Sequence, residues 1–335
     1  MSGAWETLRY RDFRYHLQQI EVREVGPAEV VRSELSVRVL ATADGGRLIQ
    51  KTVHREAGRA DPELYALLDR EIRAGARLLR RFSETAYPAE LSKMVGYDID
   101  REDPFVLLEH TPGAPVRAQA GNLLTGDQHA FEVGFFRALR LIEAAKLVHG
   151  GLSLDAVWRG SGGIQVTSFE HAVLAGEPRV RNRVSRSCPP DQRAVRGTAS
   201  PRDDVWSAGA VLMEVVTGGD PGPAPDAARF GPALAELLSS VFHPDPAARP
   251  TASDLLARLG ESDHVPPRPD GAAREFAASR QRFDEVLDGK RRGRSGEPAH
   301  AGESPSTRLR TLYMVAGVVA VVVVVAVGYA LGVIG

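Results

Sequence analysis

The side chains with the clearest chemical potential lie in one stretch, residues 147–172. Asp155 and Glu170 are its carboxylates, and either has the oxygen ligands that a divalent metal ion needs. A simpler interpretation makes Asp155 a loop residue that caps its own backbone and Glu170 a solvent-facing charge. Glycines at 150–151, 160 and 162–163 divide the stretch into short apolar runs, which predicts a β-hairpin beside a loop.

The composition excludes several other kinds of site. The chain has 335 residues with 43% hydrophobic and 25% charged residues, which is typical of a globular protein long enough for two lobes. Its nine histidines are scattered and Cys188 is its one cysteine, so neither a Cys/His metal site nor an intramolecular disulfide is expected. A net charge of −1 gives no general reason to expect a nucleic-acid partner.

The elements that must position these residues follow from hydrophobic periodicity and turn signals. Residues 1–20 have mixed periodicity that does not distinguish a helix from a strand. Short apolar runs predict strands at 20–25, 30–31, 35–41, 47–53 and 105–108. Apolar residues at helical spacing predict helices at 61–82 (with Asp61 as N-cap), 131–148, 204–217, 233–242 and 251–259. Strands followed by helices favour an α+β protein with two lobes.

The stretch 147–172 resembles the catalytic segment of protein kinases, His-x-Asp-Leu-Lys-Pro-x-Asn followed by Asp-Phe-Gly. The same frame here begins at His149 and continues as Ser168-Phe169-Glu170. The spacing of the motif is kept, but the side chains that carry out catalysis in the family are missing. The resemblance puts the base aspartate, the loop lysine, the metal-binding asparagine and the metal-binding aspartate at Gly151, Ser153, Ala156 and Ser168.

Other segments within residues 20–260 are similar to kinase segments in the same order. Asp204 starts a segment similar to Asp-Val-Trp-Ser-x-Gly, whose aspartate holds the catalytic-loop backbone in the family. Arg249 lies in a match to Asp-Pro-x-x-Arg-Pro-Thr, which implies an ion pair with Asp191. Together with His149 and Phe169, these residues form a scaffolding set that persists. The resemblance therefore implies a two-lobed kinase-like fold with a β-rich N-terminal lobe and a helical C-terminal lobe.

The nucleotide site is implied by the same resemblance. Lys51 takes the place of the lysine that reaches the phosphates, and Glu71 that of its helical partner. Glu109 and Thr111 fall in the hinge between the lobes, and Leu108 takes the position that guards the adenine pocket. These residues are the expected cofactor contacts, with ATP as the cofactor and without productive Mg²⁺.

The departures from the kinase pattern point away from catalysis. Losing the general base alone lowers a rate by roughly 10²–10⁴, and the missing metal ligands remove the main neutralisation of the phosphates. Only Gly26, followed by a proline without an N–H, stands where a glycine-rich phosphate loop belongs. Gly75, four residues after Glu71, lacks the apolar side chain usual there, so the helix is not expected to be held in the active position.

The C-terminal part of the chain differs in composition from the part before it. Residues 312–334, from Leu312 to Ile334, are uncharged and long enough to span a membrane, with arginines before them. We expect a tail-anchored, single-pass protein of the cell membrane whose N-terminal part is cytoplasmic. The expected organisation is an N-terminal extension (1–19), a kinase-like domain (20–260), a Pro/Gly/Arg-rich juxtamembrane linker (261–310) that carries a helix at 272–287, and a transmembrane helix (311–335).

Three functions remain open. The first is a membrane-anchored pseudokinase that binds other proteins, such as an active kinase or a phosphopeptide-binding protein, with no nucleic acid. The second is an atypical active serine/threonine kinase that uses Asp155 or Glu170, and the third is a nucleotide sensor without transfer. The arginine-rich loop 173–199 is either a phosphorylation target or a solvated basic loop.

Overall fold

The structure is a computed structural model that describes residues 3–267, apart from 28–32, 83–86, 111 and 183–186. The chain divides into two compact units, Met1–Ala272 and Ala273–Gly335, and the described residues all belong to the first. The segment predicted to span a membrane lies outside the described residues. Within the described ranges, no helix is both long and apolar enough to cross a bilayer.

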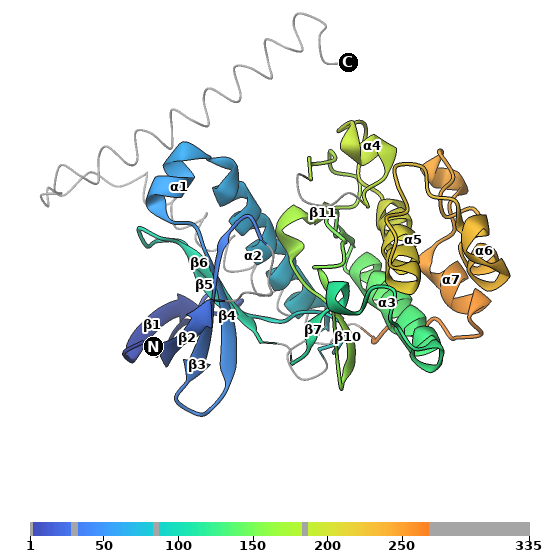
Figure 1. The fold of residues 1–335 in the computed structure, drawn as a ribbon. Helices are drawn as coiled ribbons and strands as arrows, with labels where there is room; N and C mark the ends of the chain where they lie inside the picture. The colour runs from blue at the N-terminus through green and yellow to red at the C-terminus, as the bar shows by residue number, and fades with distance from the viewer. Residues whose placement is uncertain (1–2, 28–32, 83–86, 111, 183–186, 268–335) are drawn as a thin grey trace, which may run out of the picture. The chain divides into compact units, whose positions relative to one another are not determined.

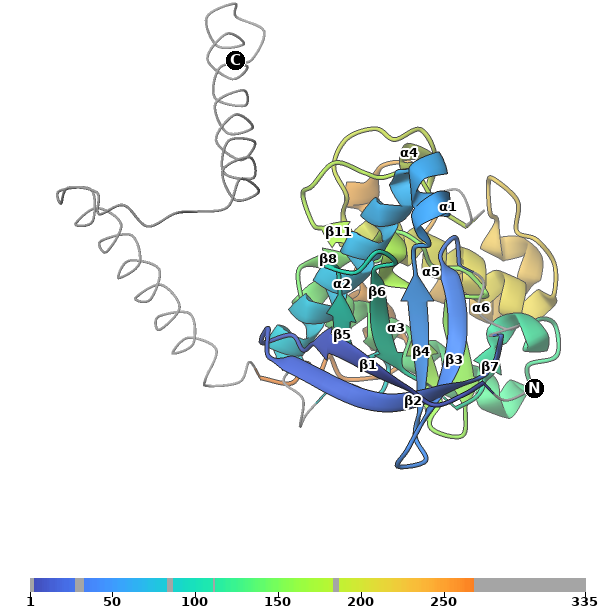
Figure 2. The same cartoon turned by 90° about the vertical axis from the view of Figure 1, so that its left-hand side faces the viewer.

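The N-terminal part is a closed antiparallel β-barrel with the strand order β1-β2-β3-β4-β6-β5 (Figure 2). Its strands are β1 (Glu6–Arg11), β2 (Leu17–Pro27), β3 (Ser36–Thr42), β4 (Arg47–Thr52), β5 (Met94–Asp98) and β6 (Phe105–Glu109). The strands predicted at 20–25, 35–41, 47–53 and 105–108 are therefore present as β2, β3, β4 and β6, whereas the strand predicted at 30–31 lies outside the described residues. The boundary predicted at residue 20 does not separate an extension from the domain, because β1 pairs with both β2 and β5 and closes the barrel.

The two faces of the barrel wall carry different cores, because side chains alternate along a strand. The inner face is filled at one end by Leu8, Val22, Leu40, Leu48, Phe105 and Leu107. The outer face includes Ile49, Val106 and Leu108, which pack with Leu67 and other residues of α2. Helix α2 (Glu63–Phe82) matches the predicted helix, and the carboxylate of Asp61 accepts from the amide of Glu63 at 3.1 Å. Helix α1 (Arg55–Ala60), just before it, was not predicted.

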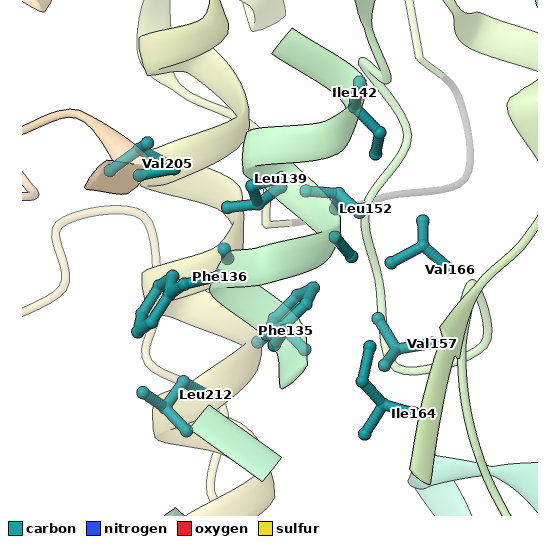
Figure 3. Close-up of a cluster of buried hydrophobic side chains, with 14 of the residues drawn as sticks. Phe135, Phe136, Leu139, Ile142, Leu152, Val157, Ile164, Val166, Val205 and Leu212 are labelled. Atoms are coloured by element: carbon teal, nitrogen blue, oxygen red, sulfur yellow. The ribbon is translucent and has the colours of Figure 1, made fainter. Parts of the chain in front are cut away.

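The C-terminal part is mainly helical (Figure 1). Its elements are β7 (Ala114–Pro115), α3 (Thr125–Ala144), β8 (Leu147–Val148), β9 (Val157–Gly160), β10 (Gly163–Val166), β11 (Val173–Leu174), α4 (Pro190–Arg193), α5 (Pro201–Thr217), α6 (Pro232–Leu237) and α7 (Ala252–Arg258), with 3-10 turns at Val116–Gln119, Phe169–His171, Ala227–Phe230 and Pro246–Ala248. Figure 3 shows Phe136 and Leu139 of α3 facing Val205 and Leu212 of α5 in the core.

Helix α3 differs from the helix predicted over 131–148. It starts earlier and ends at Ala144, because Lys146 adopts a left-handed φ of 60° that stops the helix. Leu147 and Val148 then form β8, which pairs with β11. The hairpin predicted in the central stretch is present as β9 and β10, and Gly163 at φ 102° supplies the backbone conformation that its turn needs.

Residues 261–267 are docked on the helical part, although a mobile linker was predicted from residue 261. Arg137 and Arg140 of α3 form ion pairs with Glu261 at 2.6 Å and Asp263 at 2.7 Å. Arg81 at the end of α2 donates to the carbonyl oxygen of Pro266 at 2.9 Å. Residues 261–267 are therefore part of the folded domain, and the rest of the predicted linker, with its predicted helix at 272–287, lies outside the described residues.

Candidate functional site

Lys51 lies between two carboxylates where the barrel meets the helical part. Its Nζ is 2.9 Å from Oε2 of Glu71, which lies on α2, and 2.8 Å from Oε1 of Glu170, which follows β10. The side chains of all three residues are 5% exposed or less. The Lys51–Glu71 pair is the one the resemblance implies. Glu170 is not a solvent-facing charge, because it shares the ammonium group with Glu71.

The electrostatics of this triad keep Lys51 in its charged form, paired with both carboxylates. Burial alone would lower the pKa of Lys51, but Glu170 and then Glu71 outweigh it and raise that pKa above its ordinary value. Burial raises the pKa of Glu71. Burial also acts to raise the pKa of Glu170, but Lys51 and a hydrogen bond from Ser33 outweigh it, and the pKa is lowered. The charged form of Glu170 is therefore stabilised by Lys51 and Ser33.

Residues 33–34, shortly before β3, contact the segment that carries Glu170. Ser33 donates from its hydroxyl to Oε1 of Glu170 at 2.6 Å, and Glu34 lies 3.6 Å from His171. From the other side, Nε of Arg70 on α2 donates to the main-chain oxygen of Glu170 at 2.8 Å. Glu170 is thus fixed by contacts to its side chain and to its backbone.

The cleft beside Lys51 contains a cavity of only about 20 Å³. That is room for roughly one water molecule. Its walls come from both parts of the molecule: Ile49, Lys51, Ser92, Leu108, Glu109, Trp158, Thr167 and Ser168. The resemblance implies four of these positions, Lys51, Leu108, Glu109 and Ser168, and the structure brings them together. Thr111 lies outside the described residues.

Trp158 forms part of the wall of this small cavity, and sequence reasoning missed it. It is a buried residue of β9, and its indole Nε1 donates to the main-chain oxygen of Asp155 at 3.2 Å. The available signal was a bulky aromatic residue in the strand directly after the loop. Glu109 instead turns outward and pairs with Lys93 at 2.8 Å.

Asp155 is engaged elsewhere, so it neither caps its own backbone nor is placed to hold a metal ion. Both of its carboxylate oxygens accept from the guanidinium of Arg117, each at 2.7 Å. A bidentate pair of this kind satisfies the carboxylate. Among the described residues, no group of three or more His, Cys, Asp or Glu side chains is arranged to hold a metal ion.

The position of the missing base, Gly151, is closed in by neighbours. A Cβ atom there would meet Cδ2 of His171 at 3.2 Å and Nδ2 of Asn182 at 3.4 Å. Ser153 uses its hydroxyl to accept from the amide of Ala156 at 3.3 Å. These positions thus carry no acid, and a side chain at position 151 would require His171 to shift by a few tenths of an ångström.

Ser168 and Ala156 likewise bring no acidic group to the cleft. Ser168 has a left-handed φ of 63°, and its hydroxyl lies 3.5 Å from Nζ of Lys51. Ala156 is buried, and its main-chain oxygen accepts from Thr167. The loop can form hydrogen bonds, but it offers no carboxylate to a phosphate-bound metal.

The scaffolding residues hold the loop in place. Asp204 accepts from the amides of His149 at 2.6 Å and Gly150 at 2.9 Å, which are the contacts that the resemblance implies. Burial raises the pKa of Asp204 to about 7. The rings of His149 and Phe169 pack with their centroids 4.7 Å apart. The amide of Phe169 also hydrogen-bonds to Glu71, which joins the loop to α2.

Arg249 has a different main partner from the one expected. It lies 4.0 Å from Asp191 but 3.4 Å from Asp203, and its guanidinium packs over the ring of Trp206 at 4.8 Å. Asp203 also receives a pair of hydrogen bonds from Arg179 at 2.9 and 3.0 Å. Asp203 is buried, whereas the side chain of Asp191 is 36% exposed, so Asp203 carries the stronger interaction.

Helix α2 is held toward the cleft, contrary to the expectation drawn from Gly75. A Cβ atom on Gly75 would come within 2.8 Å of Cβ of Met94, so the side chain of Met94 already fills the space beside the glycine. Met94 on β5 thus supplies the apolar packing that the helix itself lacks. This packing places Glu71 of α2 within reach of Lys51, and the ion pair forms.

Comparison with known proteins agrees with this geometry at the level of family. The probable serine/threonine-protein kinase PkwA of Thermomonospora curvata is 24% identical to the chain over 249 residues, which is 68% of this chain and 32% of that relative. The chain thus spans about a third of the length of the relative it matches. No protein-family model matches the chain. The similarity supports a kinase-like family.

Proposed function

We propose that the chain is a non-catalytic member of the kinase-like family, a pseudokinase whose folded domain binds other proteins. The observation that carries this proposal is the Glu71–Lys51–Glu170 triad. In an active kinase, the lysine must be available to the phosphates while a single glutamate positions it. Here a second buried carboxylate occupies that place, 2.8 Å from Nζ.

Electrostatics support the same conclusion against a nucleotide sensor. A triphosphate brings several negative charges, and this site already holds two carboxylates against one ammonium group. Like charges in a buried site repel strongly, because the surroundings screen them poorly. The cavity of about 20 Å³ beside Trp158 adds a steric barrier to an adenine ring.

The atypical active kinase is the weaker alternative because its candidate carboxylates already form ion pairs. Its two candidate carboxylates are both engaged, Asp155 with Arg117 at 2.7 Å and Glu170 with Lys51 at 2.8 Å. Neither is placed to serve a metal ion without first breaking an ion pair. Scaffolding contacts such as Asp204 to the loop backbone persist, which favours a domain selected for its shape.

The proposed role includes anchoring to a membrane through residues 312–334 and recognition of a protein partner on the cytoplasmic side. The length and apolar character of this segment support the anchoring. An active kinase or a phosphopeptide-binding protein is the partner class that we propose.

The proposal is tested by nucleotide binding and by phosphoryl transfer. We expect no rise in melting temperature with about 5 mM ATP, with or without Mg²⁺, since only ligands that bind the native state stabilise it. A variant with Trp158→Leu and Glu170→Gln frees Lys51 and enlarges the cleft, and there ATP should raise the melting temperature. Mg²⁺-dependent transfer by the unaltered protein that is lost in Lys51→Met would overturn the proposal.

A further inference from the structure

One end of the barrel interior is polar, which is unusual for the inside of a small barrel. Leu40 pairs with Leu48 across β3 and β4, and the next inward pairs along the same strands are Arg38 with Gln50 and Ser36 with Thr52. Residues that pair directly across a sheet share a face, so these four lie on the same inner face as the leucines.

The polar character extends to both neighbouring strands. Glu24 of β2 pairs with Leu40, and Thr52 of β4 pairs with Phe105 of β6, which places all of them on the inner face. Small barrels normally fill such positions with apolar side chains. A cluster of departures from a local rule in a folded protein is most often found at a functional site.

This polar end opens into a cavity that is much larger than the cleft at Lys51. The cavity has a volume of about 400 Å³, against about 20 Å³ for the cleft at Lys51. Its walls include the five polar inward side chains, Glu24, Ser36, Arg38, Gln50 and Thr52. The mouth of a β-barrel is a frequent place for a small-molecule site, and this volume lies in the usual range.

The polar groups are held in position by one another. Arg38 donates from Nε to Oε1 of Gln50 and pairs with Glu24 at 3.4 Å. On the opposite side, His54 contacts Ser36 through Nε2 at 3.1 Å and Asp103 through Nδ1 at 3.2 Å. Gln50 is only 3% exposed, so its amide is fixed within the wall. Such a wall is preorganised to form several hydrogen bonds at once.

The charge of the cavity indicates which ligands it suits. Arg38 and Arg101 contribute two positive charges, and Glu24 and Asp103 contribute two negative charges, so the lining is balanced. A balanced lining gives no preference for an anion such as a phosphate. Carboxylate, amide, guanidinium and hydroxyl groups side by side can pair with neighbouring hydroxyls of one ligand, each acting as donor or acceptor.

We propose that the barrel mouth binds a neutral polyhydroxylated small molecule, of the sugar or cyclitol class. The site lies on the inner face of the barrel wall, whereas Lys51 lies on the other face. It therefore does not depend on the proposed loss of catalysis. It would give the domain a small-molecule input separate from the nucleotide cleft.

The test is calorimetric titration of the full-length chain with D-glucose, trehalose and myo-inositol, one at a time. We expect at least one of these probes to bind with a dissociation constant of about 1 mM or tighter. Thr52→Val removes one wall hydroxyl at nearly constant shape, and Gln50→Leu removes the buried amide. Each should weaken binding about tenfold or more, because wall groups left without their ligand partner lose a hydrogen bond. Gln18→Leu on the exposed part of β2 is the matched control and should bind as the unaltered chain does.

Three outcomes would overturn the proposal. The first is no heat with any of the three probes at about 50 mM, which exceeds the expected dissociation constant many times over. The second is binding that Thr52→Val and Gln50→Leu leave unchanged, because the ligand would then lie elsewhere. The third is binding of glycine betaine, a zwitterion, in preference to all three polyols. Far-ultraviolet circular dichroism of each variant separates lost binding from lost folding, and Thr52→Val serves as the test if Gln50→Leu fails to fold.

Discussion

At Lys51, one ammonium group is shared by two carboxylates at almost the same distance, 2.9 Å to Glu71 and 2.8 Å to Glu170. Burial raises the pKa of Glu71, whereas Lys51 and the hydrogen bond from Ser33 outweigh burial at Glu170 and lower its pKa. Either one alone is enough to neutralise Lys51. Removing both leaves a buried charge without a counterion.

This redundancy predicts a non-additive pair of mutations. Glu71→Gln and Glu170→Gln should each lower the free energy of unfolding by about 1 kcal/mol, since Lys51 keeps one carboxylate. The double variant should lose about 3–5 kcal/mol, the usual effect of an unpaired buried charge. Urea unfolding of the unaltered chain, the two single variants and the double variant measures the coupling free energy between the two carboxylates. Purely additive losses would show that the two carboxylates do not share Lys51.

His149 is held in one neutral form by its two ring contacts. Its Nε2 lies 2.9 Å from the main-chain oxygen of Thr167, and the amide of Gly151 donates to its Nδ1 at 3.1 Å. The hydrogen bonds assign the proton to Nε2. A second proton on Nδ1 would face the N–H of Gly151. Burial is the main cause that lowers the pKa of His149 to about 4.

This lowered pKa predicts a loss of stability in acid. The unfolded chain takes up a proton on His149 below about pH 6.5, whereas the native chain does so only near pH 4, so stability falls as the pH falls between these values. Relative to His149→Phe, the unaltered chain should lose about 2 kcal/mol more unfolding free energy between about pH 7.5 and pH 5. Asp204 has the opposite dependence, because its raised pKa contributes stability that is lost as the pH rises through about 7. This contribution is common to both proteins. Urea unfolding at the two pH values measures the difference, and equal losses in both proteins would contradict a neutral His149.

Helix α2 is the element that joins the barrel to the site, because it carries Glu71 and also Arg70, which holds the backbone of Glu170. Its position depends on the close approach of β5 at Gly75. The clash at 2.8 Å would involve Cβ of Met94, which is tied to the backbone and cannot swing away. The glycine is therefore a packing requirement of the element.

A pair of glycine substitutions tests this requirement. Gly75→Ala should lower the free energy of unfolding by about 1–2 kcal/mol, because overpacking outweighs the gain of about 1 kcal/mol in helix propensity. Gly126→Ala in α3 is the matched control, since a Cβ atom there meets nothing within 4 Å. It should stabilise the protein by up to about 1 kcal/mol. Thermal unfolding of both variants shows whether overpacking or helix propensity determines the effect of an added methyl group. Stabilisation by Gly75→Ala would show that β5 can move away.

The elements were predictable from sequence where local patterns decide them. Alternation and turn residues predicted β3, β4 and β6, and apolar spacing predicted α2 and α5. Helix α1 was missed because a six-residue helix, Arg55–Ala60, carries too few turns for a periodic signal. Strand β1 was undecided because its pairing with β2 and β5 depends on partners distant in sequence.

The site was predictable only in part, for a similar reason. Motif spacing indicated Lys51, Glu71 and the contact of Asp204 with the loop backbone. It gave no indication that Glu170 would reach Lys51, more than a hundred residues away, or that Arg117 would take both oxygens of Asp155. Those contacts are set by tertiary packing, which places charges from separate elements in one buried space.

At the scale of the whole molecule, residues 261–267 are held on the folded unit by several side-chain and main-chain contacts. Asp263 accepts from Arg140 at 2.7 Å and from the hydroxyl of Ser253 at 2.8 Å, and Arg81 binds the main-chain oxygen of Pro266. Val265 packs against the helical core. The folded domain that precedes the proposed membrane segment at 312–334 therefore extends at least to Pro266.

Membrane anchoring through residues 312–334 is the prediction that links the domain to its proposed setting. About two dozen uncharged residues exceed the roughly 20 that a helix needs to cross a bilayer core of roughly 30 Å. The full-length chain should sediment with membranes and resist extraction by salt or alkaline carbonate. A chain ending at Pro267 should stay in the supernatant with its fold intact, because every contact described above is retained. A matched variant with Val322→Arg and Val325→Arg places two charges at the centre of the segment, where each costs about 2.5–3.5 kcal/mol of insertion free energy. Its release from membranes would assign the anchoring to this segment, whereas a full-length chain that stays in the supernatant would contradict it.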